Sequence, residues 1–392
     1  MKICDPGRKK VLCIIGTSSS VLINFRGSLI RHLFLRGYTV YCFCSDFDEH
    51  TSGELRSRGG IPIGYKLDSK GLNPISDVMA VIELIKALKA IKPDVIFSYF
   101  VKPVIFGSIA GRMARVPRVV GMLEGLGNAF AVGASGIGIK ARFVKFIQLI
   151  LYRVAFSCID TLLFLNPDDR AELKKGCGFL PKTSAILGGI GVDLDEFAYV
   201  PPTRDSVVRF LFVGRLLREK GIFEYLEAAQ YLTKNYKGRV QFTVLGSFDL
   251  DNPFALKEAE LRQFLSDGVV EYPGFVDNIK DWIVSSHVFV LPSYREGVPR
   301  STQEAMAIGR PIITTDVPGC RETVIDGVNG FLIPPHSSAE LIGKMEFFIH
   351  NPNALLTMGL AARSFAEEKF DERSVHRRLE GILFDEKHAG VE

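Results

Sequence analysis

The feature that most constrains the fold of this chain is the order of its predicted secondary structure. Short runs of apolar and β-branched residues alternate with longer segments of helical periodicity over nearly the whole length. This alternation is typical of parallel sheets whose consecutive strands are connected by helices. We therefore predict an α/β fold built from doubly wound parallel sheets.

The alternating pattern occurs twice, which predicts two domains. Strands of the first series are expected at residues 10–15, 38–44, 61–65, 94–97, 118–122, 161–165 and 184–187. Residues 192–206 have the Asp, Pro, Thr and Arg composition of a linker. Strands of the second series are expected at residues 207–213, 240–245, 268–271, 288–291, 311–314 and 331–333. The expected boundaries are an N-terminal domain over 1–195, a C-terminal domain over 206–372, and a last helix within 373–392 that crosses back to the first domain.

Connecting helices are expected, for example, at residues 24–36 and 74–91. The second of these places four apolar residues on one face, the pattern of an amphipathic helix: Val78, Ile82, Ile85 and Leu88.

In doubly wound domains, ligands bind outside the carboxyl ends of the strands. Two such domains facing each other would therefore share one site in a cleft.

The composition excludes several classes of protein. A formal net charge of +4 is too small for a nucleic-acid-binding face, so we predict no nucleic-acid partner. The seven cysteines include no C-x-x-C pair, which favours a reducing cytoplasm. The apolar run near the N-terminus, residues 11–15, is too short for a signal sequence, so none is expected. The most apolar long stretch, residues 143–165, is interrupted by charges, so no spanning helix is expected either. The seven histidines lack metal-ligand spacing, so no metal site is predicted.

The strongest candidate site is residues 294–309, which enter a helix near Ser301. Glu296 lies in the loop before the helix, beside the backbone amide of Gly297, and Glu304 lies one turn inside it. A helix N-terminus offers free N–H groups and a positive dipole end to an anion. Carboxylates near it can accept hydroxyl hydrogens from a sugar or a ribose. The alternative is a capping box made by Ser301 and Glu304, which needs no ligand.

A second candidate is residues 214–221, directly after the first strand of the second domain. Arg215 and Lys220 lie where this strand opens into a helix. Two cations suit a diphosphate, and an arginine can bind it through two N–H groups. The alternative is a solvated helix start in which Glu219 is the local partner. Both candidates follow strands of the same sheet, so we expect them at one edge.

The first domain offers weaker candidates. Gly16, Thr17 and the serines after them can bring backbone N–H groups close to a ligand. Lys102 and Glu124 follow later strands, where a side chain would touch the donor or the acceptor of a reaction. The alternatives are an ordinary polar loop after Gly16, a surface charge at Lys102, and glycines beside Glu124 that only shape a turn.

Residues 137–155 predict a basic amphipathic helix that would lie on a membrane with its cations toward anionic headgroups. The alternative is a helix that covers its domain and leaves a charged face in solvent.

A glycine pattern at residues 136–141 matches a dinucleotide fingerprint, but no strand precedes it, so we reject a nicotinamide cofactor. Among the histidines, His32 is expected to be structural. His287 is kept as a possible functional residue, because it lies near Glu296 in the sequence.

These segments resemble the retaining glycosyltransferases of family 4. The most specific similarities are EGVPRSTQEAMAIGRPII at residues 296–313 and GRLLREKG at residues 214–221. The resemblance covers nearly the whole chain and implies the GT-B fold, two Rossmann-like domains that face each other across a cleft. More narrowly, NFRG (24–27), VKPVIFG (101–107) and EGLGNAF (124–130) look like bacterial enzymes that extend undecaprenyl-diphosphate-linked sugars.

The resemblance also implies roles for individual residues. The catalytic residues would be Arg215 and Lys220 on the donor diphosphate, Glu296 near the reacting end of the donor sugar, and Glu124. The remaining donor-binding residues would be Gly16, Thr17, Gly297, Val298, Pro299 and, through the ribose hydroxyls, Glu304. Asn24 and Lys102 would lie on the acceptor side. The histidine that many members place near the donor sugar has no evident equivalent here.

The implied reaction is transfer of a hexosamine, N-acetylgalactosamine by resemblance, from a UDP-sugar to an undecaprenyl-diphosphate-linked sugar in surface polysaccharide or O-antigen synthesis. It would proceed with retention of configuration and without a metal or other cofactor, because the two cations replace one. The enzyme would be cytoplasmic and peripherally associated with the inner face of the plasma membrane through residues 137–155. The alternatives are a UDP-sugar 2-epimerase of the same fold, or a non-catalytic partner that binds sugar nucleotides.

Overall fold

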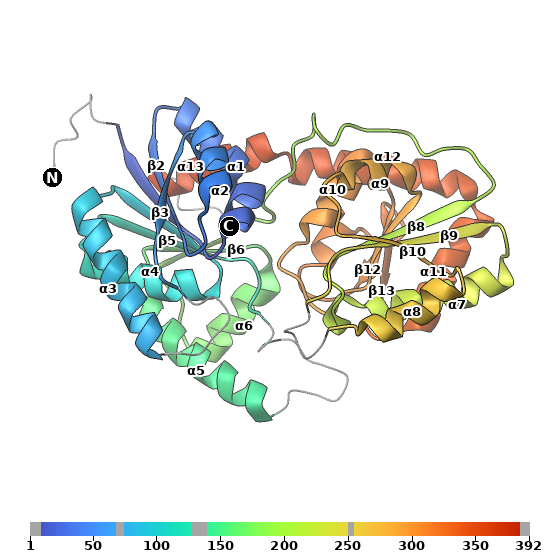
Figure 1. The fold of residues 1–392 in the computed structure, drawn as a ribbon, viewed down its shortest axis with the longest axis horizontal. Helices are drawn as coiled ribbons and strands as arrows, with labels where there is room; N and C mark the ends of the chain where they lie inside the picture. The colour runs from blue at the N-terminus through green and yellow to red at the C-terminus, as the bar shows by residue number, and fades with distance from the viewer. Residues whose placement is uncertain (1–8, 68–73, 128–129, 131–138, 250–254, 385–392) are drawn as a thin grey trace. The chain divides into compact units, whose positions relative to one another are not determined.

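The computed structural model describes residues 9–67, 74–127, 130, 139–249 and 255–384 (Figure 1). The chain forms two compact units. The first comprises Met1–Ala129, Lys140–Leu187 and His376–Glu392, and the second comprises Phe130–Ile139 and Gly188–Val375. Each unit is built on one parallel sheet, as the alternation of elements predicted.

The first unit contains a seven-stranded parallel sheet in the order β3-β2-β1-β4-β5-β6-β7. Its strands are β1 (Val11–Ile15), β2 (Thr39–Cys44), β3 (Gly60–Gly64), β4 (Val95–Tyr99), β5 (Arg118–Leu123), β6 (Thr161–Phe164) and β7 (Thr183–Ile186). The connecting helices are α1 (Ser19–Leu35), α2 (Glu49–Ser57), α3 (Pro74–Ile91), α4 (Val101–Met113), α5 (Ile139–Phe156) and α6 (Pro167–Cys177). The strand order reverses between β1 and β4, so the loops after these strands diverge and leave room for a ligand.

The reversal also assigns the helices to the two faces of the sheet. Crossovers between parallel strands are right-handed, so α1 and α2 cover one face while α3, α4 and α5 cover the other (Figure 1). The core under α3 is a cluster of buried residues from both helices and strands, among them Cys13, Ile96, Leu84, Leu88 and Ala110. Burial of this apolar surface is the main stabilising contribution to the unit.

The second unit contains a six-stranded parallel sheet in the order β10-β9-β8-β11-β12-β13. Its strands are β8 (Val208–Val213), β9 (Val240–Leu245), β10 (Glu271–Gly274), β11 (Val288–Leu291), β12 (Ile312–Thr315) and β13 (Gly330–Ile333). Its helices are α7 (Ile222–Asn235), α8 (Glu258–Ser266), α9 (Ile279–Ser285), α10 (Arg300–Ile308), α11 (Ser338–His350) and α12 (Pro352–Lys369), with short 3-10 helices η2 (Arg218–Lys220) and η3 (Arg321–Thr323). Here the strand order reverses between β8 and β11, so the two strongest candidate motifs follow neighbouring strands.

The last helix, α13 (Glu372–Phe384), begins in the second unit, and its residues from His376 on belong to the first. Glu380 attaches it to α1. Its carboxylate lies 2.9 Å from His32 Nε2, and accepts hydrogen bonds from Tyr38 Oη at 2.9 Å and from Arg36 Nε at 3.2 Å. His32 is therefore a structural residue, as expected from its helical position.

Several boundaries differ from the sequence prediction. Helix α1 begins at Ser19, five residues before the predicted start, because Ser18 occupies the cap position and Asp46 accepts the Ser19 N–H at 2.6 Å. Strand β10 begins at Glu271, and the apolar Val269 and Val270, on which the prediction was based, precede it as buried loop residues. In α3 the predicted apolar face is only partly the packed one. Of its four residues, Leu88 is buried and Ile85 packs against the core, whereas Val78 and Ile82 are exposed. Ala80 and Leu84 complete the buried face.

Candidate active site

The carboxyl edge of the second sheet brings the loops after β8 and β11 together. Gly221 ends η2 with φ +73°, and a Cβ at this position would overlap the carbonyl group of Pro292. Only glycine combines this left-handed conformation with so close an approach of two backbones. The Tyr294 N–H donates to the Glu219 carbonyl at 2.8 Å, which connects the two loops a second time. The strands are neighbours, so the two motifs lie side by side as expected.

Lys220 and Glu296 form an ion pair between these loops. Glu296 also accepts a hydrogen bond from Ser293 Oγ at 2.6 Å, and Ser293 Oγ lies 3.1 Å from the Glu219 carbonyl oxygen. The side chains of Lys220 and Glu296 are 20% and 11% exposed, so the pair is shielded from most solvent but remains accessible. The alternative with Glu219 as local partner does not describe this ion pair, because the carboxylate that pairs with Lys220 comes from the neighbouring loop.

Glu219 nevertheless belongs to the same charge cluster. Burial raises its pKa, and the nearby charges of Lys220 and Arg215 partly oppose that rise. Arg215 itself reaches outward, with 55% of its side chain exposed, and its Nη1 lies 3.1 Å from Asp249 Oδ2. The second unit thus presents two cations, each held by a carboxylate, at one sheet edge. Sequence reasoning missed Ser293 and Asp249; the one available signal for Ser293 was its place directly after a buried strand.

Helix α10 carries Glu304 on its buried side. Its N-cap is Pro299, no side chain caps it, and Ser301 lies inside the helix, so the capping-box alternative is wrong. Glu304 instead accepts a hydrogen bond from Arg300 Nε at 2.9 Å, one turn earlier. Burial raises the pKa of Glu304, and Arg300 opposes the rise. A buried carboxylate with one arginine partner at a helix N-terminus retains lone pairs for hydroxyl groups of a ligand.

The segment from Glu296 to Pro299 is fixed by the loop after β12. Glu296 N–H donates to the Pro318 carbonyl at 3.0 Å. Gly319 has φ +81°, and a Cβ there would overlap the carbonyl groups of Glu296 and Gly297. Val298 is buried, and its carbonyl accepts a hydrogen bond from Gln303 Nε2 at 3.2 Å. These contacts fix the conformation of the backbone that is predicted to line the sugar and phosphate.

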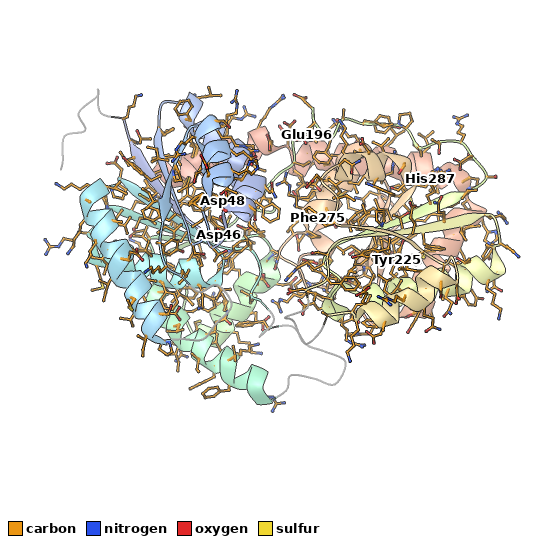
Figure 2. All side chains as sticks on the ribbon, viewed as in Figure 1. Asp46, Asp48, Glu196, Tyr225, Phe275 and His287 are labelled. Atoms are coloured by element: carbon orange, nitrogen blue, oxygen red, sulfur yellow. The ribbon has the colours of Figure 1, made fainter. Side chains whose placement is uncertain are left out.

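In the first unit, Gly16 and Thr17 leave the carboxyl end of β1. The Gly16 carbonyl accepts a hydrogen bond from Tyr65 Oη at 2.7 Å, and the Thr17 carbonyl accepts one from Ser45 Oγ at 2.8 Å. The N–H of Ser19, at the start of α1, does not face an empty site, because it donates a hydrogen bond to the Asp46 carboxylate. Asp46 lies beside Asp48 at the end of β2 (Figure 2). A carboxylate thus already occupies the helix N-terminus that an anionic ligand would prefer.

Arg26 and Glu124 form a buried ion pair at the same edge of this sheet. Their side chains are only 3% and 7% exposed. The Arg26 guanidinium lies 5.0 Å from the centre of the Tyr99 ring, and neither Arg26 Nε nor Tyr99 Oη has a hydrogen-bond partner among the described residues. Burial raises the pKa of Glu124, while the charge of Arg26 opposes the rise. Sequence reasoning singled out Glu124 but missed Arg26, although it lies in the NFRG segment.

The two acceptor-side candidates lie on the helices that follow β1 and β4. Lys102 Nζ lies 3.0 Å from Asp77 Oδ1, which connects the first turns of α4 and α3. Asn24 is exposed on α1, one turn of helix away from the loop at Gly16. Phe100, which joins β4 to α4, has φ +67°, a strained conformation for an aromatic residue. Strain of this kind is commonly found at functional sites.

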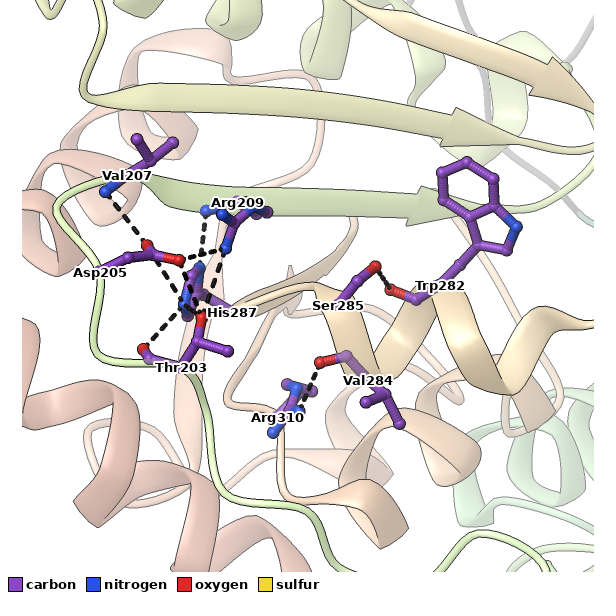
Figure 3. A network of polar contacts seen from close by, with 9 residues as sticks. All are labelled: Thr203, Asp205, Val207, Arg209, Trp282, Val284, Ser285, His287 and Arg310. Carbon is purple, nitrogen blue, oxygen red and sulfur yellow. Dashed lines mark hydrogen bonds and ion pairs between the residues drawn. The ribbon is translucent and has the colours of Figure 1, made fainter.

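His287 does not belong to the Glu296 loop in space. It precedes β11, and therefore lies at the amino end of the strand, whereas Glu296 follows the carboxyl end. Its Nδ1 accepts the Arg209 N–H at 3.0 Å, so Nε2 carries the ring proton and donates to the Thr203 carbonyl at 3.1 Å (Figure 3). Burial lowers the pKa of His287. The residue attaches the segment before β8 to the sheet.

Helix α5 combines exposed apolar and basic side chains, as predicted for residues 137–155. Phe143, Phe146, Ile150 and Val154 are exposed. Lys145 is paired with Glu172 at 2.7 Å. In the part of the chain that the structure describes, no helix has the length and hydropathy needed to cross a bilayer. The glycine pattern at 136–141 falls largely outside the described residues.

Comparison with known proteins agrees with this architecture. The family described as "Glycosyl transferase 4-like" matches residues 10–166, and "Glycosyl transferases group 1" matches residues 199–365. Anabaena HepE in complex with UDP and glucose has a similar fold, with a TM-score of 0.76 at 16% identity over 95% of this chain and 99% of that chain. Sucrose-phosphate synthase from Thermosynechococcus elongatus gives a TM-score of 0.74 at 18% identity over 95% and 98%. The two sheet-based units therefore define a GT-B fold.

Two curated relatives extend the similarity to sequence. An N,N'-diacetylbacillosaminyl-diphospho-undecaprenol alpha-1,3-N-acetylgalactosaminyltransferase of Campylobacter jejuni is 28% identical over 91% of this chain and 94% of its own length. A UDP-Gal:alpha-D-GlcNAc-diphosphoundecaprenol alpha-1,3-galactosyltransferase of Escherichia coli is 30% identical over 67% and 68%. The chain belongs to the glycosyltransferase family defined by these two domains, and it is a glycosyltransferase.

Proposed function

We propose that this glycosyltransferase transfers a hexosamine from a UDP-sugar to an undecaprenyl-diphosphate-linked sugar during surface polysaccharide or O-antigen synthesis, with retention of configuration. The observation that carries the proposal is the similarity to the Campylobacter transferase over nearly the full length of both chains. That relative's N-acetylgalactosaminyl activity makes N-acetylgalactosamine the first sugar to test. The loop pair of Lys220 and Glu296 supplies a chemically suitable donor site.

The donor would bind at the carboxyl edge of the six-stranded sheet. Lys220 and Arg215 can offset the charge that develops on the departing UDP diphosphate, an electrostatic contribution to catalysis. Both are held near carboxylates and both reach solvent, so a diphosphate can join their ion pairs. Glu304 would accept the ribose hydroxyls, and the backbone of Gly297 to Pro299 would line the sugar and phosphate. Glu296 would contact the sugar near its anomeric carbon.

The acceptor would bind at the carboxyl edge of the seven-stranded sheet. Glu124 is the carboxylate available there to orient the acceptor, and Arg26 holds it. Gly16 and Thr17 would lie near the donor sugar, and Asn24 and Lys102 would contact the acceptor. Retention would follow from attack on the same face that the diphosphate leaves, with the phosphate accepting the proton.

Two further parts of the proposal concern the conditions of the reaction. No metal would be required, because Arg215 and Lys220 occupy the role that a divalent cation has toward a diphosphate. The enzyme would work at the cytoplasmic face of the plasma membrane, where α5 contacts anionic headgroups through its basic and apolar side chains. No nucleic-acid partner is proposed.

The deciding experiment is donor turnover by the purified protein. A panel of UDP- and GDP-sugars is incubated in EDTA with and without a synthetic polyprenyl-diphosphate-linked N-acetylhexosamine, and nucleotide release is measured. Release that depends on one UDP-sugar and on the lipid acceptor supports the proposal and identifies the donor. Loss of turnover in EDTA that magnesium restores would contradict the metal-independent part.

Other outcomes identify the alternatives. Conversion of a UDP-sugar without acceptor would support an epimerase. Binding of UDP-sugar without turnover under every condition would support a non-catalytic partner. The carbohydrate product is analysed by NMR, because an inverted anomeric configuration would contradict the same-face mechanism.

A further inference from the structure

Helix α3 carries apolar side chains on two faces. The packed face consists of Ala80, Leu84 and Leu88, none of which is more than 1% exposed. On the other face, a stripe at helical i, i+3, i+4, i+7 spacing is exposed by 74%, 59%, 60% and 48%: Ile75, Val78, Met79 and Ile82. A helix that is apolar all round is normally buried on every side. We call these four residues the α3 stripe.

The α3 stripe has a counterpart on α5. There Phe143, Phe146, Ile150 and Val154 are 43% to 63% exposed at similar spacing. Helices α3, α4 and α5 lie on the same face of the seven-stranded sheet (Figure 1). The first unit therefore exposes two apolar helical surfaces on one side. Apolar side chains scattered singly over a surface are ordinary, whereas these are grouped.

The α3 stripe begins near the edge of the sheet that carries the acceptor-side candidates. Helices that connect parallel strands run opposite to the strands, so α3 starts at the carboxyl edge. The ion pair between Asp77, in the first turn of α3, and Lys102, in the first turn of α4 after β4, shows this directly. A surface that contacts the α3 stripe therefore also lies close to the residues proposed to receive the acceptor.

Basic side chains continue the stripe toward the other end of α3. Lys86 and Lys89 follow at the same helical spacing and are exposed. Lys89, Lys92 and Arg115 also line a cavity of about 660 Å³ at the C-terminal ends of α3 and α4. An apolar stripe that ends in cations is complementary to a bilayer with anionic headgroups.

We propose that the α3 stripe is a second lipid-binding surface, which acts with α5 to seat the protein on an anionic bilayer. The proposal rests on the proposed function, since a lipid-linked acceptor places the reaction at a membrane. A bilayer is favoured over a second copy of the chain by charge. Anionic headgroups complement Lys86 and Lys89, whereas a second copy would meet the stripe with the same apolar and basic residues.

The test is binding to vesicles, measured by co-sedimentation of the full chain. The stripe variant combines Ile75→Gln with Val78→Gln, because glutamine removes apolar surface but is a good helix former. The control variant combines Leu35→Gln on α1 with Leu360→Gln on α12, whose side chains are 70% and 46% exposed away from the stripe. Vesicles contain phosphatidylcholine alone, or phosphatidylcholine and phosphatidylglycerol in equal parts.

On the mixed vesicles, we expect the stripe variant to bind about tenfold more weakly than the parent, and the control variant to bind like the parent. Binding of the parent should weaken on phosphatidylcholine alone and at high salt, because the cations are screened. Equal binding of the stripe variant and the parent would overturn the proposal. So would a change in oligomeric state, measured by sedimentation velocity, without a change in vesicle binding.

Turnover separates this surface from the proposed function. With a short, water-soluble acceptor the stripe variant should keep the activity of the parent, whereas with a long-chain acceptor in mixed vesicles it should lose most of it. If no lipid-linked acceptor supports turnover by the parent, the proposed function fails while vesicle binding still tests the stripe. If the stripe variant and the parent are equally active on the long-chain acceptor in vesicles, the α3 proposal is contradicted, whereas the proposed function is not.

Discussion

Arg26 donates from Nη2 to Oε1 of Glu124 although 98 residues separate them in the sequence, and almost no solvent reaches either side chain. Removing two charges from water costs free energy, and in many proteins apolar residues stabilise such a position as well or better. The pair lies at the carboxyl edge of its sheet, next to Tyr99. We infer that the fold retains it because Arg26 keeps the Glu124 carboxylate ionised and oriented for the acceptor.

The first prediction concerns this pair. Arg26→Met should lower the free energy of unfolding by about 3–5 kcal/mol, because it leaves a buried carboxylate without its partner. The double variant Arg26→Met with Glu124→Leu should recover most of that loss, yet remain inactive. Urea unfolding and UDP release measure the two quantities. A stable double variant that turns over normally would show that the pair serves only the fold.

The second prediction concerns Lys220. Lys220→Met should reduce kcat by about 10²–10³-fold, the usual effect of removing one group that stabilises transition-state charge. Steady-state kinetics with the identified donor provides the measurement. Arg218→Met is the matched control, since Arg218 lies in the same 3-10 helix but stacks on Phe223, 4.2 Å from the ring centre. An equal loss in both variants would indicate a general effect of charge and not a specific contact.

The third prediction compares two glycines with nearly equal φ angles. Gly221 has φ +73° and Gly238 has φ +74°. Alanine at Gly238 should cost only the left-handed strain of about 1 kcal/mol, because nothing lies within 4 Å of its Cβ. Alanine at Gly221 should cost clearly more and reduce turnover, since its Cβ would overlap the Pro292 carbonyl and separate the two site loops. Thermal unfolding of both variants shows whether the two substitutions lower the stability of the protein equally or unequally.

The fourth prediction concerns donor binding and pH. Glu304 must be ionised to accept two ribose hydroxyl hydrogens, and burial raises its pKa above the usual value. Affinity for UDP should therefore fall as pH decreases, and the fall should begin at a higher pH than an ordinary glutamate would give. Glu304→Gln should weaken UDP binding by about 10–100-fold, equivalent to about 1.5–3 kcal/mol for hydrogen bonds to a charged group. It should also remove this part of the pH dependence, which calorimetric titration would detect. Unchanged affinity would exclude the assigned role.

The fifth prediction concerns His287 and stability. Burial lowers its pKa in the folded protein, so the unfolded chain takes up the proton first as pH falls. Stability should be unaffected by this group above about pH 6.5, the ordinary pKa, and should decrease below it. His287→Gln can still bond to Thr203 or to the Arg209 N–H but cannot titrate, so its stability should depend less on pH in that range. Parallel pH profiles of urea midpoints would contradict this.

The sequence predicted which loops form the site better than it predicted which side chains pair with each other there. The placement of Lys220 and Glu296 at one edge followed from the order of apolar runs, because both follow strands of a parallel sheet. Their direct pairing across 76 residues did not follow, since it depends on β8 and β11 being neighbours. In the sequence, Glu219 was the nearer partner. Ser293 and Asp249 carried no pattern that distinguished them from other polar loop residues.

The α/β class, the two series of strands and the two donor-side loops were determined by the sequence alone, because strand and helix periodicities and turn residues are local properties. Which of two apolar faces of α3 packs on the sheet was decided only by the tertiary structure. Periodicity marks apolar positions on a helix, but packing depends on the shape of the sheet beneath, where Leu84 and Leu88 fit and Val78 and Ile82 remain outside. The same holds for Arg26 and Glu124, whose pairing required β1 and β5 to be joined through β4 in one sheet.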